Sequence, residues 1–150
     1  MENISITNAE WQVVKAICAN PDIQSGEISK ILCERFEWKN ATVKTLIHRL
    51  LEKKVIKNKQ SGKKYLYYTD FSIDDLAKQM MQSQIEKICS TKVGKIIVSL
   101  IDKNELSFKD LDDIKKALEN KKQFAVDEVK CNCIPGQCDC NHESCCGHRK

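Results

Sequence analysis

The sequence predicts a mostly α-helical protein with a small β-wing, in which an N-terminal winged helix-turn-helix precedes a helical domain and a cysteine-rich tail. Apolar residues recur at helical spacing through most of the chain before the tail. One basic segment rich in strand-forming residues interrupts these helices. The last twenty residues contain six of the nine cysteines. These observations divide the chain into residues 1–70, 71–125 and 126–150.

The composition is that of a folded soluble protein, with 41% hydrophobic and 31% charged residues. The N-terminus lacks the basic and apolar regions of a signal peptide, and no run of about eighteen apolar residues occurs. We therefore expect a cytoplasmic protein with no membrane partner. The chain also lacks a glycine-rich phosphate loop, a His-Glu-x-x-His string and a Gly-x-Ser-x-Gly elbow, so we expect no enzyme.

Caps and apolar spacing predict the first two helices. The segment Thr7-Asn-Ala-Glu10 is a capping box, so a helix should begin there and run to about Ala19, before Asn20-Pro21. A second helix is expected from about Gly26 to Arg35, where apolar residues again fall at helical spacing. Two short helices in succession are typical of the start of a helix-turn-helix.

A third helix and the hairpin after it carry most of the basic charge. Residues 39–64 contain nine Lys or Arg and a single acid, a net charge of +8. Apolar spacing buries one stripe of this helix and turns the other side chains outward, namely Thr42, Lys44, Thr45, His48 and Arg49. Two strand-like runs then flank a turn at Gln60-Ser61-Gly62. This wing carries the candidate phosphate contacts Lys57, Lys59, Lys63, Lys64 and Tyr65.

Such a basic face is typical of a polyanion site, although a solvated lysine face is the alternative. In a winged helix-turn-helix the outer face of the last helix enters the major groove. We therefore interpret residues 1–70 as a domain that binds double-stranded DNA.

Residues 71–125 are predicted to form helices with one apolar stripe each. The last of these helices should begin at a capping box, Ser107-Phe-Lys-Asp110. So small a helical region buries little apolar area alone, so we expect the stripes to meet a second copy of the chain in a homodimer. Packing onto the winged helix in a monomer is the alternative. Cys18, Cys33 and Cys89 lie on or near apolar stripes and are interpreted as core residues.

The tail contains a Cys-x-Cys, four-residue turn, Cys-x-Cys array formed by Cys131, Cys133, Cys138 and Cys140. Pro135-Gly136 can fold the second pair back on the first, so that thiolates surround one ion. Thiolates at this density are soft ligands that select zinc, cuprous ion or an iron–sulfur cluster. Further candidate ligands follow the array, namely Cys145 and Cys146, with His142 and His148 nearby.

The segment from Trp38 to Lys53 resembles the recognition helix of the BlaI/MecI family of penicillinase repressors, and residues 6–11 and Leu106-Ser107 resemble it as well. The tail array resembles that of the CopY-type copper-responsive repressors within that family. The resemblance implies a homodimeric bacterial transcriptional repressor on an inverted-repeat operator ahead of copper-export genes. It also implies that Cys131, Cys133, Cys138 and Cys140 hold Zn(II) in the DNA-bound form. Cu(I), often delivered by a copper chaperone, would displace the zinc and release the DNA.

Two other functions remain open. A metallothionein-like metal buffer would need only the tail, and the basic segment argues against it. A penicillinase-type repressor relieved by proteolysis would use the cysteines for a structural zinc site. Release from the operator by cuprous ion without cleavage would distinguish the copper-responsive repressor from the latter.

Overall fold

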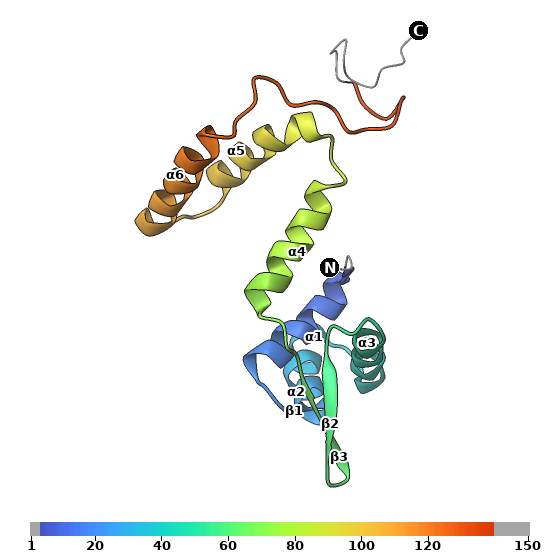
Figure 1. The fold of residues 1–150 in the computed structure, drawn as a ribbon. Helices are drawn as coiled ribbons and strands as arrows, with labels where there is room; N and C mark the ends of the chain where they lie inside the picture. Colours follow the sequence, from blue (N-terminus) through green and yellow to red (C-terminus); the bar gives the residue numbers. More distant parts are fainter. Residues whose placement is uncertain (1–3, 140–150) are drawn as a thin grey trace. The chain divides into compact units, whose positions relative to one another are not determined.

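The computed structural model describes residues 4–139 (Figure 1). These residues form two compact units, and the boundary between them falls between Ser83 and Gln84. Helices dominate both units, and the first also contains a three-stranded antiparallel sheet. The predicted fold class, mostly helical with a β-wing and a winged helix-turn-helix at the N-terminus, is confirmed.

The first three helices form the helix-turn-helix. Helix α1 (Asn8–Ala19) begins at the predicted capping box, in which Thr7 and Glu10 exchange backbone-to-side-chain hydrogen bonds of 3.1 and 3.2 Å. Helix α2 (Ser25–Phe36) begins after the short strand β1 (Ile23–Gln24) and is one residue longer at each end than expected. Helix α3 (Asn40–Glu52) follows a short connection.

The wing is a hairpin of strands β2 (Lys57–Ser61) and β3 (Lys64–Tyr68), and β1 pairs with the other edge of β3. Ser61 pairs with Lys64, so the turn consists of Gly62 and Lys63 rather than the predicted Gln60-Ser61-Gly62. Gly62 has a φ of +63°, which suits glycine at the first central position of a type II′ turn. Strand pairing therefore extends further toward the tip than the sequence indicated.

The core of the first unit gathers apolar side chains from α1, α2, α3 and the sheet. Val13, Ile28 and Leu50 are fully buried there. Leu76 from helix α4 (Ile73–Ile85) belongs to the same core, so the start of α4 packs on the winged helix. At Leu76 the apolar stripe of α4 therefore packs onto the winged helix of the same chain, which is the alternative to packing against a second copy.

A buried ion pair joins α1 to the end of α3. The Glu10 carboxylate is only 1% exposed, and Lys53 Nζ lies 2.7 Å from its Oε2 atom. Burial raises the pKa of Glu10, but the hydrogen bonds from Lys53 and the Thr7 N–H, with the charges of Lys53 and Arg49, lower it below 4.5. Glu10 is therefore held as a carboxylate inside the domain.

The second unit contains a 3₁₀ turn, η1 (Ser90–Lys92), and helices α5 (Val93–Lys103) and α6 (Phe108–Lys122). Ser107 caps α6 with Asp110 as predicted. No residue of α5 or α6 is buried, and Phe108 is 91% exposed. Within residues 4–139, no helix has the length and apolar character needed to cross a membrane.

Candidate metal centre and nucleic-acid interface

Four thiols meet in the second unit. Cys89 lies immediately before η1, and the other three come from the tail: Cys131, Cys133 and Cys138. All four sulfur atoms lie within 4.8 Å of one another. The Sγ atoms of Cys131 and Cys89 are 3.5 Å apart, and those of Cys131 and Cys138 are 3.4 Å apart. The tail therefore folds back onto the start of α5 (Figure 1).

The spacing of these thiols fits a soft metal ion. Four sulfurs placed tetrahedrally about 2.3 Å from a zinc ion are roughly 3.8 Å apart. The observed separations are close to this value and well above the roughly 2.05 Å of a disulfide bond. The donor set, consisting only of thiols, favours zinc or cuprous ion over calcium or magnesium.

Two thiols of the cluster, Cys89 and Cys133, have pKa values shifted in opposite directions. Hydrogen bonds from the Thr91 side chain and backbone lower the pKa of Cys89 to about 7. Burial, together with hydrogen bonds to Cys89 and Cys131, raises the pKa of Cys133 to about 12. Of these two thiols, Cys89 loses its proton more readily than Cys133. Metal binding requires thiolates and therefore displaces the remaining protons.

Polar contacts beside the thiols also join the tail to η1. The Ser90 N–H donates to Asn132 Oδ1 at 2.9 Å, and Ser90 Oγ donates to the Lys130 carbonyl at 2.5 Å. Lys92 Nζ forms an ion pair of 2.9 Å with Asp139. These contacts fall at both ends of tail residues 130–139, and they hold this segment near Cys89.

The structure brings together three of the predicted metal ligands, Cys131, Cys133 and Cys138. Cys140, Cys145 and Cys146, with His142 and His148, lie outside the described residues. Cys89 was interpreted as a core residue, and it is indeed buried, but its thiol lies among the tail cysteines and not in the apolar core of the first unit. Its one sequence signal was its place in a short break between two helical stripes, where a side chain need not pack in a core. Cys18 and Cys33 do pack against the core, as predicted.

The outer face of α3 is exposed along its length. Each of the predicted contact residues on it is exposed: Thr42, Lys44, Thr45, His48 and Arg49. The opposite face is buried through Val43, Leu46, Ile47 and Leu50. Thr45 Oγ1 donates to the Ala41 carbonyl at 2.9 Å, and His48 Nε2 lies 3.2 Å from Glu52 Oε1.

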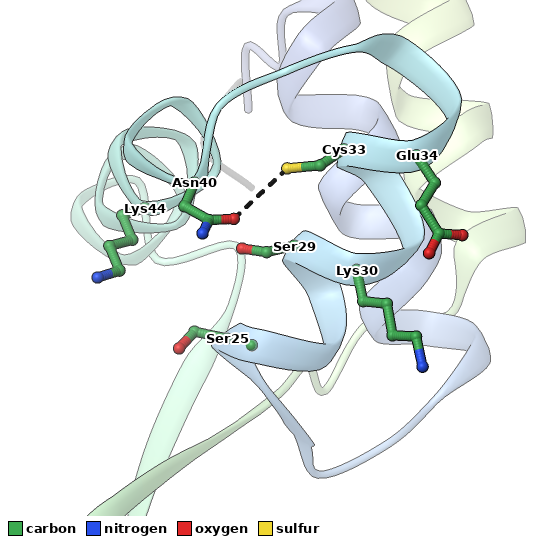
Figure 2. A pocket seen from close by; sticks show the side chains of 8 residues that line it. Ser25, Ser29, Lys30, Cys33, Glu34, Asn40 and Lys44 are labelled. Carbon is green, nitrogen blue, oxygen red and sulfur yellow. Dashed lines mark hydrogen bonds between the residues drawn. The ribbon is translucent and has the colours of Figure 1, made fainter.

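A shallow pocket of about 450 Å³ lies between α2 and α3. Figure 2 shows Ser25 and Ser29 on α2 across from Asn40 and Lys44 on α3, while the side chain of Lys30 points away from α3. The Cys33 thiol donates to Asn40 Oδ1 at 3.7 Å and closes one end. The pocket is open to solvent, so it forms part of the face presented by the two helices.

The wing lysines differ in their surroundings. Lys57 is paired with Asp70, and Lys59 lies 2.9 Å from Asp22 and 5.5 Å from the centre of the Tyr68 ring. Lys63 lies in the turn at the tip, and Lys64 and Tyr65 begin β3, all three exposed. The tip therefore carries cationic charge that the acids near the base of the wing do not neutralise.

These features define the class of the protein: a winged-helix DNA-binding protein with a thiol cluster beside its C-terminal helices. The sequence model of the penicillinase repressor family matches residues 6–120. The chain therefore belongs to the penicillinase repressor family, whose members are transcriptional repressors rather than enzymes.

Similar proteins include an uncharacterized 16.5 kDa protein of Latilactobacillus sakei, 30% identical over 92% of this chain and 94% of that protein. The penicillinase repressor of Staphylococcus aureus is 24% identical over 79% of this chain and 94% of its own length. Among solved structures, the DNA-binding domain of the repressor BlaI is 26% identical and superposes with a TM-score of 0.45, covering 49% of this chain and 90% of that one.

Proposed function

We propose that this protein is a metal-responsive repressor of the CopY type. In its zinc form it binds an operator as a homodimer, and it leaves the DNA when Cu(I) displaces zinc from the tail, which controls copper-export genes. The observation that carries this proposal is the gathering of tail thiols into one cluster on a chain that belongs to a repressor family. The proposed site of action is the cytoplasm, where thiols stay reduced.

The DNA contacts are proposed on α3 and the wing. Lys44 and Arg49 can donate to guanine edges or phosphates, and the threonines Thr42 and Thr45 suit phosphates or a thymine methyl. His48 can also face the groove. The wing residues are proposed to hold phosphates, which gives affinity without sequence choice: Lys57, Lys59, Lys63, Lys64 and Tyr65.

The dimer contacts are proposed on α5 and α6. Ile97, Val98 and Leu100 on α5, with Leu111 and Leu118 on α6, are exposed apolar residues. Burying such a surface against a second copy removes it from water, which is the main favourable term in association. A twofold dimer would present two α3 helices to half-sites about 34 Å apart.

The metal ligands are proposed to be the tail thiolates of Cys131, Cys133, Cys138 and Cys140, with Cys145 and Cys146 as further candidates. Bound zinc supplies a closed tetrahedral centre that orders four thiolates, whereas cuprous ion is satisfied by fewer sulfurs. The tail can therefore take two arrangements. A coupling of about 1–3 kcal/mol between them changes operator affinity by roughly 5- to 150-fold. A copper chaperone is the proposed donor of Cu(I).

The direct test is a titration of the zinc-loaded dimer on a labelled inverted-repeat operator with cuprous ion. DNA release is followed by fluorescence anisotropy, and zinc release by a colorimetric chelator in the same cuvette. We expect both signals to change together. DNA release that precedes zinc loss would show that displacement is not the trigger. A variant with serine at all four array cysteines should bind the operator without responding to copper.

Family membership also favours a second function, a repressor relieved by proteolysis whose tail holds structural zinc. Mass spectrometry after induction distinguishes the two. A full-length chain in the released fraction supports the copper response, and a chain cut between the two units supports proteolysis.

A further inference from the structure

We propose that Cys89 is a ligand of the tail metal site, so that an ion bound there fastens the tail to the segment that begins α5. This inference rests on the proposed function to the extent that the tail binds metal. In this inference Cys89, which lies outside the cysteine array and 42 residues before Cys131, takes the fourth position of the tetrahedral site in place of Cys140.

The position of the Cys89 thiol carries the inference. Its Sγ atom lies 3.5 Å from that of Cys131 and within 4.8 Å of those of Cys133 and Cys138. Cys89 is only 8% exposed, whereas the three tail cysteines are half-buried. Cys89 therefore forms the inner wall of the cluster, and the tail covers it from outside.

Hydrogen bonds around the cluster hold the tail beside Cys89. The backbone N–H of Cys133 donates a hydrogen bond to Cys131 Sγ at 3.3 Å. Ser90 donates hydrogen bonds to Lys130 and Asn132, and Lys92 donates one to Asp139. These hydrogen bonds involve residues adjacent to all four cysteines. Bringing Cys89 into a coordination sphere with the tail thiols therefore needs no rearrangement of the backbone.

A link from Cys89 to the tail closes a loop that contains both α5 and α6. A tetrahedral ion uses four thiolates, and Cys89 with three tail cysteines supplies that number. An ion satisfied by two or three sulfurs can be held by the tail alone, and Cys89 is then the thiol that is released. The number of ligands that the ion requires would thus decide whether the tail stays attached to η1.

Cobalt(II) titration of the full-length protein in reducing buffer tests this ligand. The intensity of the thiolate-to-cobalt charge-transfer band scales with the number of coordinating thiolates. We expect Cys89→Ser to lose about a quarter of that intensity and to bind zinc at least about 10-fold more weakly in competition with a chelator. Cys33→Ser, which removes a thiol of the first unit, should change neither value. An unchanged band in Cys89→Ser with a reduced band in Cys140→Ser would overturn the inference.

Alkylation of the unsubstituted protein gives a second readout that does not depend on a variant folding. Zinc should slow labelling of Cys89 together with Cys131, Cys133 and Cys138, and leave Cys18 and Cys33 unchanged. Equal labelling of Cys89 with and without zinc, beside protected tail cysteines, would contradict the inference.

Operator binding separates this inference from the proposed function. Suppose that the cobalt and alkylation experiments identify Cys89 as a ligand but metals leave operator affinity unchanged. The assignment of Cys89 is then supported, and the proposal of a metal-responsive repressor is contradicted. If copper still releases the operator while Cys89 proves not to be a ligand, the repressor stands and the inference fails.

Discussion

Lys53 Nζ lies 2.7 Å from the Glu10 carboxylate, although the two residues are 43 positions apart in the chain. The same ammonium group donates to the Ser5 carbonyl at 2.7 Å. Glu10 belongs to the capping box of α1, and Lys53 follows the last residue of α3. One ion pair therefore fixes the start of α1 against the end of the helix that carries the basic face.

Removing the cation should destabilise the first unit. Lys53→Met leaves a buried carboxylate without its partner, so we expect a loss of about 1–3 kcal/mol in the free energy of unfolding at pH 7. Urea unfolding of the full chain, followed by the fluorescence of Trp11 and Trp38, measures this change. Lys15→Met removes an exposed lysine from α1 and should alter stability little. Equal effects of the two variants would contradict the assigned role of Lys53.

Acid should weaken the same pair. Because the pKa of Glu10 is lower in the folded state than the ordinary 4.5, its contribution to stability is complete above about pH 4.5 and disappears as the pH falls through the lower, folded value. Glu10→Gln should remove this part of the acid dependence and lower stability at neutral pH. Urea midpoints measured from pH 3 to 7 compare the two proteins. Parallel pH profiles would show that Glu10 is not the group that titrates.

The wing lysines should contribute unequally to DNA binding. Lys63 lies at the exposed tip, whereas Lys57 is already paired with Asp70. We expect Lys63→Ala to lower the slope of log affinity against log salt by about 1, for operator and unrelated DNA alike. Lys57→Ala should have a smaller effect, and Lys115→Ala on α6 should have none. A larger effect for Lys57 would contradict this ranking.

A charge on the apolar face of α6 should disrupt the proposed dimer. Leu111 is exposed in the single chain, and a dimer interface would bury it. We expect Leu111→Glu to shift the protein toward monomer in analytical ultracentrifugation and to weaken operator binding by at least about 10-fold. Lys116→Glu places a carboxylate on the opposite side of α6 and should leave the assembly intact. A dimer that survives Leu111→Glu would show that α6 is not part of the interface.

Zinc should protect the tail from trypsin at Lys130. The Lys130 carbonyl accepts a hydrogen bond from Ser90 Oγ beside the thiol cluster, so cleavage requires this segment to open. We expect zinc to slow cleavage after Lys130 several-fold and a chelator to restore it. Cleavage after Lys63 in the wing serves as the internal control. Protection that appears equally at both sites would indicate a general effect of zinc on the protease.

Local signals predicted the helical part of this fold well. The capping boxes at Thr7 and Ser107 depend on residues three positions apart, so the sequence alone locates both helix starts. The hairpin turn was misplaced because strand pairing and the positive φ of Gly62 decide it, and two other turn-forming residues precede that glycine.

The candidate metal site was only partly predictable. The spacing of the tail cysteines predicts a metal site, since Cys131 and Cys133 are separated by one residue. Cys89 stands alone in the sequence and has no such pattern. Its role depends on a contact across α5 and α6, and helical periodicity assigns a lone cysteine to the core by default.

The thiols of the cluster all belong to a single polypeptide. A metal ion at this site would therefore need only one chain, and the midpoint of its binding would depend on the concentration of free metal and not on that of the protein. Pairing of two chains through exposed α5 and α6 residues would instead depend on protein concentration. A cell could then change the abundance of the protein, and with it the occupancy of DNA, without changing the metal level at which each copy responds.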